Sequence, residues 1–237
     1  MFKRIIFAVC LLQFVACAEL KQAAAMYALG ELTSPEIASA LKQALNLGIG
    51  KGSDQLSQKG GYLNSAYKIL LPAEARKVTE KLRFIPGFTD VENVLLQKLN
   101  SGAEDAAVAA KPIFVDAIRN MTITDGLNIL MGSDNAATQY LQGKTSTQLY
   151  QAFNPIIVNS LNKYDAIKYW KDAVSAYNKI PFVEKANPSL DGYVTNEALK
   201  GLFSMVGKEE VNIRRNPSQR TTDLLKRAFA KQDSNRK

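Results

Sequence analysis

The chain contains no histidine, and its only two cysteines, Cys10 and Cys17, lie near the start of its 237 residues. Without histidine there is no Ser-His-Asp or Cys-His triad, no histidine-ligated zinc and no usual general base near neutral pH. Without a cysteine after position 17, the domain has no disulfide, no thiol nucleophile and no cysteine-ligated metal. We therefore expect no metal and no cofactor.

Residues 1–17 (MFKRIIFAVCLLQFVAC) have the pattern of a signal segment. Lys3 and Arg4 precede an apolar run that only Gln13 interrupts. The run is too short to span a bilayer as a stable helix, and it is typical of a secretory leader. The pattern predicts a protein that is exported to the periplasm, or anchored to a membrane and facing the periplasm.

Two cleavage sites compete within this leader. Ala16-Cys17-Ala18 fits the small-x-small site of ordinary signal peptidase. The residues Phe14 to Cys17 resemble a bacterial lipoprotein box, in which Cys17 is diacylated and becomes the new N-terminus. We favour the lipoprotein interpretation because a cysteine stands at the cleavage point, and lipidated Cys17 would then be the membrane anchor.

Charge is modestly positive and concentrated near the C-terminus. After the leader, 28 basic and 22 acidic residues remain, and nine basic but only four acidic residues follow from Lys208 onward. This balance favours anionic partners, of which lipid is more accessible to an exported protein than nucleic acid. Since the aromatic residues form no stacking platform, we expect no binding of nucleic acid. Simple solubility is the alternative explanation of the charge.

Hydrophobic periodicity is helical throughout and predicts an all-α fold, a single domain of roughly nine helices in a compact irregular bundle. The expected domain spans 33–231, after an N-terminal lead-in at 18–32 and before a disordered basic tail at 232–237. Helices are expected at about 33–60, 72–84, 89–120, 123–131, 134–142, 145–161, 165–179, 195–214 and 219–231. Three pairs have the spacing of a capping box, namely Thr33 with Glu36, Thr89 with Glu92 and Thr145 with Gln148.

Two features inside these helices have structural explanations. Pro112 lies within the third helix, so we expect a kink or break near residues 109–111. The segment GIGKGS (48–53) resembles a phosphate loop only superficially, because its spacing is wrong and no strand precedes it. Gly48 and Gly52 instead lie on an apolar stripe with Ile37, Leu41, Leu45 and Leu56, which predicts close approach of a neighbouring helix.

The segment MTITDGLNILMGSDNAATQYL (121–141) is polar enough to suggest a ligand loop. Thr122 or Thr124 can cap its first helix, Gly132 suits a left-handed residue after that helix, and Ser133 or Asp134 can cap the next. Capping therefore explains its polar residues. An anion on the free amides at 135–137 is the alternative.

Glu210 is the sharpest anomaly, because it falls in the middle of the apolar face formed by Leu199, Leu202, Phe203, Val206 and Ile213. A carboxylate there is costly unless it is paired. Arg214 follows one turn later and Arg220 lies after Pro217, which predicts a buried Glu–Arg pair. The functional alternative is a general acid/base or cation ligand, with Asp191, Asp134 or Asp116 as a second acid.

The last predicted helix is also amphipathic. It carries Leu224, Leu225, Ala228 and Phe229 on one side, and Lys226, Arg227 and Lys231 on others. Such a helix either packs its apolar side on the core or lies on an anionic membrane surface.

Several segments resemble a known bacterial family. They are KPIFVDAIRNMTITDGLNILMGSDNAATQYL from Lys111 and LDGYVTNEALKGLFSMVGKEEVNIRRNPSQRTTDLLKRAF from Leu190, and the likeness covers about residues 30–230. The most specific parts are Lys111-Pro112-Ile113-Phe114, Met121-Thr122 with Asp125, Asp134 with Ala136-Ala137-Thr138, Tyr193-Val194-Thr195, and Glu210 with Ile213-Arg214, Pro217 and Arg220. In these parts the chain resembles the family called domain of unknown function 4197. The resemblance implies an exported, mostly helical envelope protein, often with a lipoprotein-like leader, and it implies no reaction.

Three functional hypotheses follow. The first is a non-enzymatic envelope lipoprotein that binds a small ligand or an envelope protein. The second is a carboxylate-based, hydrolase-like enzyme centred on Glu210, and the third is a peripheral protein that uses the C-terminal basic helix on anionic membranes. No residue is assigned as catalytic, and the candidate binding residues are Glu210, Arg214, Arg220, Asp134 and Lys111.

Overall fold

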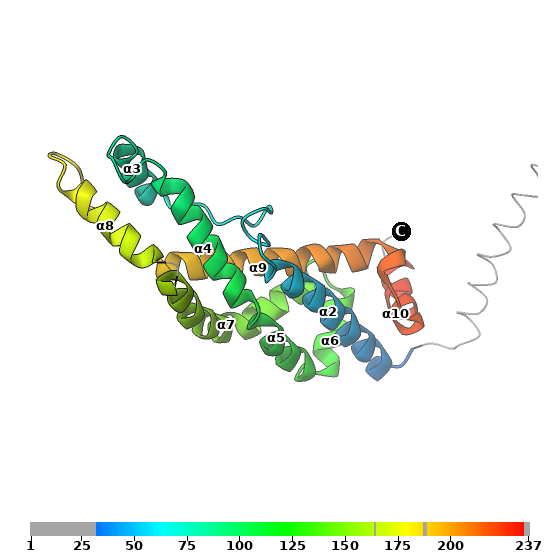
Figure 1. Cartoon of the computed structure of the whole chain (residues 1–237). Coiled ribbons are helices and arrows are strands. Elements are labelled where there is room, and N and C mark those ends of the chain that lie inside the picture. Colours follow the sequence, from blue (N-terminus) through cyan, green and yellow to red (C-terminus); the bar gives the residue numbers. More distant parts are fainter. Residues whose placement is uncertain (1–31, 164, 187–188, 235–237) are drawn as a thin grey trace, which may run out of the picture.

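The computed structural model of the protein describes residues 32–163, 165–186 and 189–234 (Figure 1). This part of the chain contains nine α-helices, one 3-10 turn and no strand, which confirms the all-α prediction. The helices are α2 (Ser34–Leu56), α3 (Ala73–Leu82), α4 (Val91–Ala107), α5 (Ala110–Arg119), α6 (Ile123–Met131), α7 (Ala136–Lys163), α8 (Ala166–Asn178), α9 (Asp191–Arg215) and α10 (Asp223–Ser234), with the 3-10 turn at Pro217–Gln219. The predicted leader and most of the lead-in lie outside the described residues.

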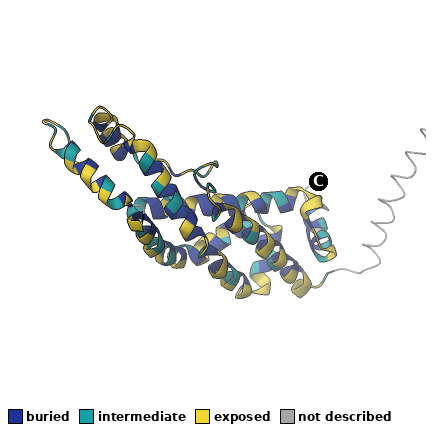
Figure 2. Cartoon of the chain, in the orientation of Figure 1, coloured by how far each residue is buried: buried dark blue, intermediate teal, exposed yellow. Residues whose placement is uncertain are grey.

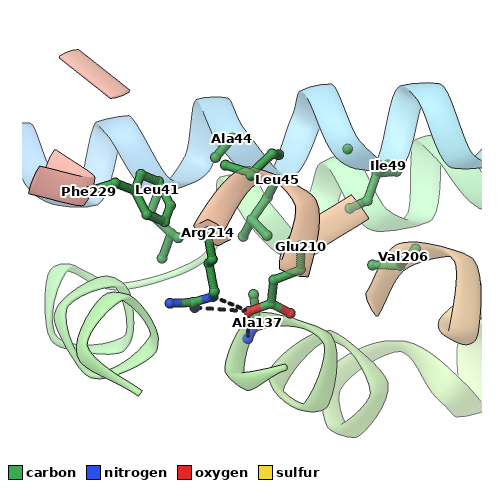
Figure 3. Close-up of a pocket in the computed structure, with 11 residues that line it drawn as sticks. Leu41, Ala44, Leu45, Ile49, Ala137, Val206, Glu210, Arg214 and Phe229 are labelled. Atoms are coloured by element: carbon green, nitrogen blue, oxygen red, sulfur yellow. Dashed lines mark hydrogen bonds and ion pairs between the residues drawn. The ribbon is translucent and has the colours of Figure 1, made fainter. Parts of the chain in front are cut away.

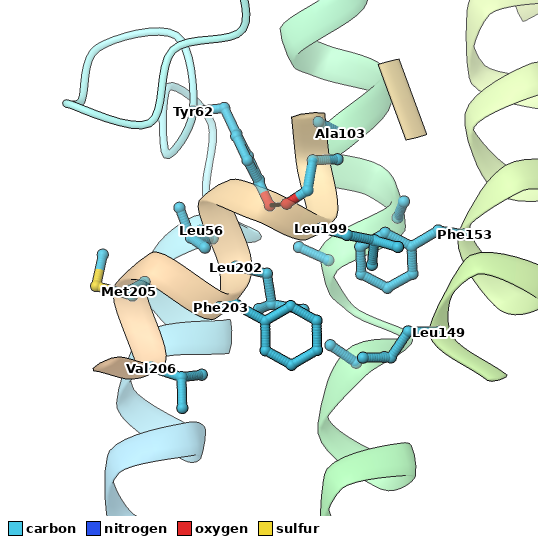
Figure 4. Close-up of a cluster of buried hydrophobic side chains, with 14 of the residues drawn as sticks. Leu56, Tyr62, Ala103, Leu149, Phe153, Leu199, Leu202, Phe203, Met205 and Val206 are labelled. Carbon is cyan, nitrogen blue, oxygen red and sulfur yellow. Dashed lines mark hydrogen bonds between the residues drawn. The ribbon is translucent and has the colours of Figure 1, made fainter. Parts of the chain in front are cut away.

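Helix α9 is the centre of the bundle and packs on α2, α4 and α7 (Figure 4). Its predicted apolar stripe is buried throughout, in one hydrophobic core that extends from Ile37 to Phe229. Phe203 of α9 meets Phe114 of α5 edge to face, with ring centroids 5.7 Å apart. An edge-to-face contact of this kind stabilises aromatic pairs beyond the area they bury.

Helix α2 crosses α9 at the two glycines that the sequence singled out. A Cβ atom added at Gly52 would lie 3.0 Å from Cγ of Met205, and one at Gly48 would lie 3.4 Å from Cβ of Glu209. Both positions are buried, as is the rest of the predicted stripe. The prediction of close helix packing at these glycines is therefore confirmed.

Of the three predicted capping boxes, one is present and two are wrong. At the start of α2, the amide and hydroxyl of Thr33 donate to Oε2 of Glu36 at 2.7 and 2.8 Å, as expected. The box at Thr89 is wrong, because Asp90 is the N-cap of α4. The box at Thr145 is also wrong, because α7 is continuous there and the hydroxyl donates to the carbonyl of Leu141 one turn back.

The ends of several helices differ from the prediction in informative ways. The expected break before Pro112 is confirmed, since α4 ends at Ala107 and Pro112 lies in the first turn of α5, where its missing N–H costs little. The first helix ends at Leu56, and Gly60, with φ of +83°, belongs to the turn that follows. Helix α10 continues to Ser234, so residues 232–234 are part of the fold rather than of a tail.

The long connection between α2 and α3 is fastened to α4 by two buried polar side chains. Asn100 accepts the amide of Ile69 at 2.8 Å and donates to the carbonyl of the same residue at 2.9 Å. Glu104 accepts the amides of Tyr62 and Leu63 at 3.1 and 3.3 Å. These bonds satisfy backbone groups that a buried connection would otherwise leave unpaired.

Helices α3 and α8 pack on each other and, with the first half of α4, project from the rest of the bundle (Figure 1). Their outer faces are exposed and their facing sides are buried (Figure 2). Two hollows lie at this projection, one walled mainly by α4, α7 and α8 and the other by α3, α8 and residues 184–186.

Candidate functional site

The carboxylate of Glu210 lies at the first turn of α7. Its Oε1 accepts the amide of Ala137 at 2.9 Å, and its Oε2 accepts both the amide of Thr138 at 2.8 Å and the hydroxyl of Thr138 at 2.7 Å. The first amides of a helix have no partner within the helix, and its N-terminus favours negative charge. Glu210 of α9 therefore caps α7 across the bundle.

Arg214 is the predicted partner of Glu210, and the buried pair is confirmed (Figure 3). Its Nε donates to Oε1 of Glu210 at 2.9 Å, and the side chain is 1% exposed. Its two terminal nitrogens donate to the carbonyls of Leu130 and Ile129 at 3.0 and 2.8 Å. Those carbonyls belong to the last turn of α6, which lacks partners within the helix and favours positive charge.

Arg220 donates hydrogen bonds to the last carbonyls of α9 and joins α10 to that helix. It donates to the carbonyls of Ile213 and Arg214 at 3.1 and 2.8 Å. It also forms an ion pair with Asp233 of α10, with a closest distance of 2.6 Å. The ring of Phe229 lies under both guanidinium groups, 5.2 Å from that of Arg220 and 5.9 Å from that of Arg214. Three helix ends are thus held by one charged cluster.

The space around this cluster is small. The cavity that Glu210, Arg214 and Phe229 line with residues of α2 has a volume of about 20 Å³ (Figure 3). That is room for about one water molecule. Both carboxylate oxygens are already occupied, so a substrate finds neither space nor a free acceptor there.

The remaining predicted site residues lie elsewhere. Asp134 forms an ion pair with Arg215 at 2.5 Å, beside the cluster but on the surface. Lys111 pairs with Asp54 of α2 at 3.3 Å, and both side chains are at least half exposed. Cys17, the predicted lipidation site, lies outside the described residues.

The backbone conformation of Gly132, between α6 and α7, differs from the prediction. It is extended, with φ of −78° and ψ of −170°, and not left-handed as expected. Glycine is needed there for space, since a Cβ atom would lie 2.8 Å from Cβ of Ala136 and 3.0 Å from the carbonyl oxygen of Asn128. Thr122, one of the two residues predicted to cap α6, is its N-cap and forms a capping box with Asp125.

Two larger hollows adjoin each other on either side of Trp170 of α8. The first has a volume of about 360 Å³ and is walled by α4, α7 and α8. The second has a volume of about 630 Å³ and lies between α3, α8 and the segment that leads to α9. Trp170, Ser189 and Leu190 line both. The first volume lies in the range of about 300 to 1,000 Å³ that is typical of small-molecule sites.

Polar groups at these hollows include a carboxylate that is held ionised. The hydroxyl of Ser189 donates to Asp191 at 2.5 Å, and this bond lowers the pKa of the Asp191 carboxyl below its ordinary value. Burial raises the pKa of Tyr193, whose hydroxyl donates to the carbonyl of Leu70 at 2.9 Å.

Within the described residues, no group of three or more histidine, cysteine, aspartate or glutamate side chains is placed so that it could hold a metal ion.

With this geometry in place, comparison with known proteins gives one decisive match. The sequence model of the family described as protein of unknown function (DUF4197) matches residues 31–230, which is most of the chain. The chain belongs to the DUF4197 family. No curated protein and no solved structure is significantly similar to it.

The DUF4197 match includes the charged cluster from Glu210 to Arg220 and also Trp170, Ser189 and Asp191 at the hollows. In this DUF4197 member, periodicity brought Glu210 and Arg214 together correctly, but it did not reveal that their partners are two helix ends. The sequence alone did not single out Trp170, which lines both hollows. None of the described helices has an apolar stretch that is long enough to cross a bilayer.

Proposed function

We propose that this DUF4197 protein is an exported, membrane-tethered binding protein whose ligand site is the pair of hollows around Trp170. The proposal is based on the difference in volume between the cavity at the charged cluster and the two hollows. The charged cluster at Glu210 encloses about 20 Å³, whereas the two hollows offer about 360 and 630 Å³. The leader, with Cys17 as the anchor, supports the location at the envelope.

The hydrolase alternative finds little support in this geometry. A general acid or base must reach a substrate proton within hydrogen-bond distance. Glu210 is 6% exposed and is held by Arg214, Ala137 and Thr138, all of which are themselves buried. The same contacts are those expected of a group that joins α6, α7 and α9.

The alternative in which α10 lies on a membrane surface requires an exposed apolar face on that helix, and this face is buried. Leu225, Ala228 and Phe229 of α10 are at most 2% exposed, because this side packs on α2. Of the basic residues in the C-terminal region, Arg214 and Arg220 are also buried in internal pairs. The surface charge available for an anionic membrane is therefore smaller than the sequence suggested.

Native mass spectrometry of the mature protein, gently purified from a bacterial envelope fraction, tests the proposal. We expect the mass of a chain that begins at lipidated Cys17 and a reproducible additional mass from a small molecule. The Val158→Phe variant, which places a ring in the first hollow, should lose that molecule. Val158 is half-buried on α7 and lines the hollow.

Ile156→Phe is the matched control, since Ile156 is equally half-buried on the same helix but does not line the hollow. The control should retain the additional mass. A bare mass in the wild type would contradict the proposal, and so would a ligand that both variants retain.

A further inference from the structure

Two phenylalanines are exposed at one end of the molecule. The side chain of Phe182 is 108% exposed and that of Phe84 is 75% exposed, the two largest values among the exposed large apolar side chains of the described residues. Phe84 lies in the turn between α3 and α4, and Phe182 follows α8. Both turns lie at the end of the bundle that is opposite to the start of α2 (Figure 1). Large apolar side chains that gather on one part of a surface indicate an interaction site.

The backbone of its turn holds Phe182 in water. Its φ of +63° is left-handed, which is unfavourable for a residue that has a Cβ atom. The turn is closed by Asn178, which accepts the amide of Ala186 at 3.0 Å and donates to the carbonyl of Ala186 at 3.4 Å. Ile180 and Val183, on either side of Phe182, pack against the core. Because strained backbone of this kind is found mainly at functional sites, the exposure of this ring indicates a function.

The turn that carries Phe84 is built in a similar way. Ile85 and Phe88 pack against the core, and the ring of Phe88 lies 6.1 Å from that of Tyr169. The ring of Phe84 is exposed, and the guanidinium carbon of Arg83 lies 4.5 Å from its centroid. Each turn therefore packs its other apolar residues and presents one phenylalanine to solvent.

The surface around the two rings carries an excess of positive charge. Residues 77–90 and 179–186 together contain five basic and three acidic side chains, a net charge of +2. The basic residues are Lys77, Lys81, Arg83, Lys179 and Lys185, and all of them are exposed. Each ring has two of these residues within three positions along the chain. Basic side chains near a membrane are attracted to the phosphate groups of anionic lipids.

We propose that these two turns insert Phe84 and Phe182 into the surface of an anionic lipid bilayer, with the neighbouring basic side chains at the phosphate groups. The rings project from two turns at the end of the bundle (Figure 1). A protein partner would need a matching pocket for each ring, whereas the boundary between head groups and acyl chains accepts apolar side chains without such pockets.

This contact is separate from the features discussed above. It does not involve α10, whose apolar side is buried, and α2, which follows the predicted anchor at Cys17 in the chain, begins at the opposite end of the bundle (Figure 1). It also goes beyond the proposed function, because it needs no ligand in either hollow.

Co-sedimentation with lipid vesicles tests the proposal. The protein is the chain from Ala18, which lacks the predicted lipidation site, and the vesicles contain equal amounts of phosphatidylglycerol and phosphatidylcholine. We expect saturable binding. Binding should be weaker at high salt and on pure phosphatidylcholine, because the attraction of the basic residues is then screened or absent, but the insertion of the two rings should preserve part of it.

Variants of the two rings identify the contact. Phe84→Ser and Phe182→Ser should each weaken binding about tenfold or more, since each removes one ring from the apolar part of the bilayer surface. Val108→Ser is the matched control, because Val108 is 65% exposed and lies in the turn at the other end of α4. The control should change binding by less than about twofold. Urea unfolding verifies that each variant is folded.

Phe182→Gly separates this role from a structural one. Glycine adopts a left-handed φ without strain, so the variant should have an equal or higher Tm while its binding falls as in Phe182→Ser. A ring that served only the fold would lower the Tm when removed and leave vesicle binding unchanged.

A wild-type chain that does not bind anionic vesicles would overturn the proposal, and so would equal binding by Phe182→Ser and Val108→Ser. Analytical ultracentrifugation without vesicles examines the other occupant. If the wild type self-associates there and binds no vesicles, while Phe182→Ser is monomeric, the ring contacts a second copy of the chain and the bilayer proposal is wrong. None of these outcomes affects the proposal for the hollows, which is tested by the mass of the retained molecule.

Discussion

The carboxylate of Glu210 accepts the backbone amide of Ala137 at 2.9 Å, although the two residues are 73 positions apart. Through this bond and the paired contact at Thr138, α9 caps α7, while Arg214, one turn further along α9, caps α6. A buried ion pair alone is weak evidence of stabilisation. Here each member also satisfies backbone groups at a helix end, so that removing one member leaves several groups unpaired.

The first prediction concerns this pair. Glu210→Gln should lower the free energy of unfolding by about 3–5 kcal/mol, because it leaves the Arg214 guanidinium buried without its counter-charge. Arg214→Met should cost a similar amount, and the double variant should cost less than the sum of the two. Urea unfolding measures all three.

Lys111→Gln is the control for the pair, since the exposed contact between Lys111 and Asp54 should contribute less than about 1 kcal/mol. If Glu210→Gln were no more destabilising than this control, the structural role of the cluster would be refuted.

A second prediction concerns the connection between α2 and α3. Asn100→Ala should lower the free energy of unfolding by about 2–3 kcal/mol, because the amide and carbonyl of Ile69 lose their buried partners. Residues 57–72 should also become more sensitive to limited proteolysis. Asn93→Ala, an exposed position on the same helix, should change stability by less than about 0.5 kcal/mol. Unchanged proteolysis in Asn100→Ala would count against this attachment.

A third prediction compares two glycines. A Cβ atom at Gly126 of α6 would lie 3.0 Å from Cβ and 3.1 Å from Cα of Ala38, and neither atom can move without the backbone of α2. Gly126→Ala should therefore destabilise by about 1–3 kcal/mol. A Cβ atom at Gly143 of α7 would have no neighbour within 4 Å, so Gly143→Ala should stabilise by up to about 1 kcal/mol. Thermal unfolding distinguishes the two, and the same sign for both would contradict the packing of α6 on α2.

A fourth prediction follows from the capping boxes. Bonds from the hydroxyl and then the amide of Thr122 lower the pKa of Asp125, and bonds from the amide and then the hydroxyl of Thr33 lower that of Glu36. Because the folded pKa lies below the unfolded one, this stabilisation is present above the ordinary values of 3.8 and 4.5 and is lost as pH falls through the folded pKa.

Urea unfolding at pH 7 and at pH 3 should therefore show a loss of stability in acid. The loss should be smaller in Asp125→Asn, which starts from a lower stability at pH 7 and has one fewer carboxylate to protonate. An equal loss in the variant would show that Asp125 does not contribute to the acid sensitivity.

Some features of the fold were predictable because they are local. The stripe of α2 and the apolar face of α9 repeat at the helical period, so their burial and the anomaly at Glu210 follow from spacing alone. The partners of Glu210 do not, since they lie on another helix and become neighbours only in the fold. An anion at the start of α7 was one interpretation of the sequence, but spacing could not show that the anion is a side chain of the same protein.

The predictions that the structure did not confirm, and the buried polar residues that were not predicted, have similar causes. Thr145 and Gln148 have the spacing of a capping box, yet Leu141 supplies an acceptor one turn earlier and α7 continues through them. Asn100 and Glu104 lie one turn apart among buried residues of α4. The helical periodicity that marks Glu210 as a polar residue on an apolar face therefore marks these two residues as well. Within the described residues the indole N–H of Trp170 has no hydrogen-bond partner, and the sequence could not predict this, because it depends on which atoms lie near Nε1 in three dimensions.

The most direct test separates stability from binding in two variants of the mature protein. Urea unfolding and native mass spectrometry would be applied to Glu210→Gln and to Val158→Phe, each at a temperature where the chain is folded. We predict that Glu210→Gln loses stability and retains the small molecule, whereas Val158→Phe retains stability and loses the molecule. Loss of the molecule from folded Glu210→Gln, with retention in Val158→Phe, would contradict this assignment and move the functional site to the Glu210 cluster.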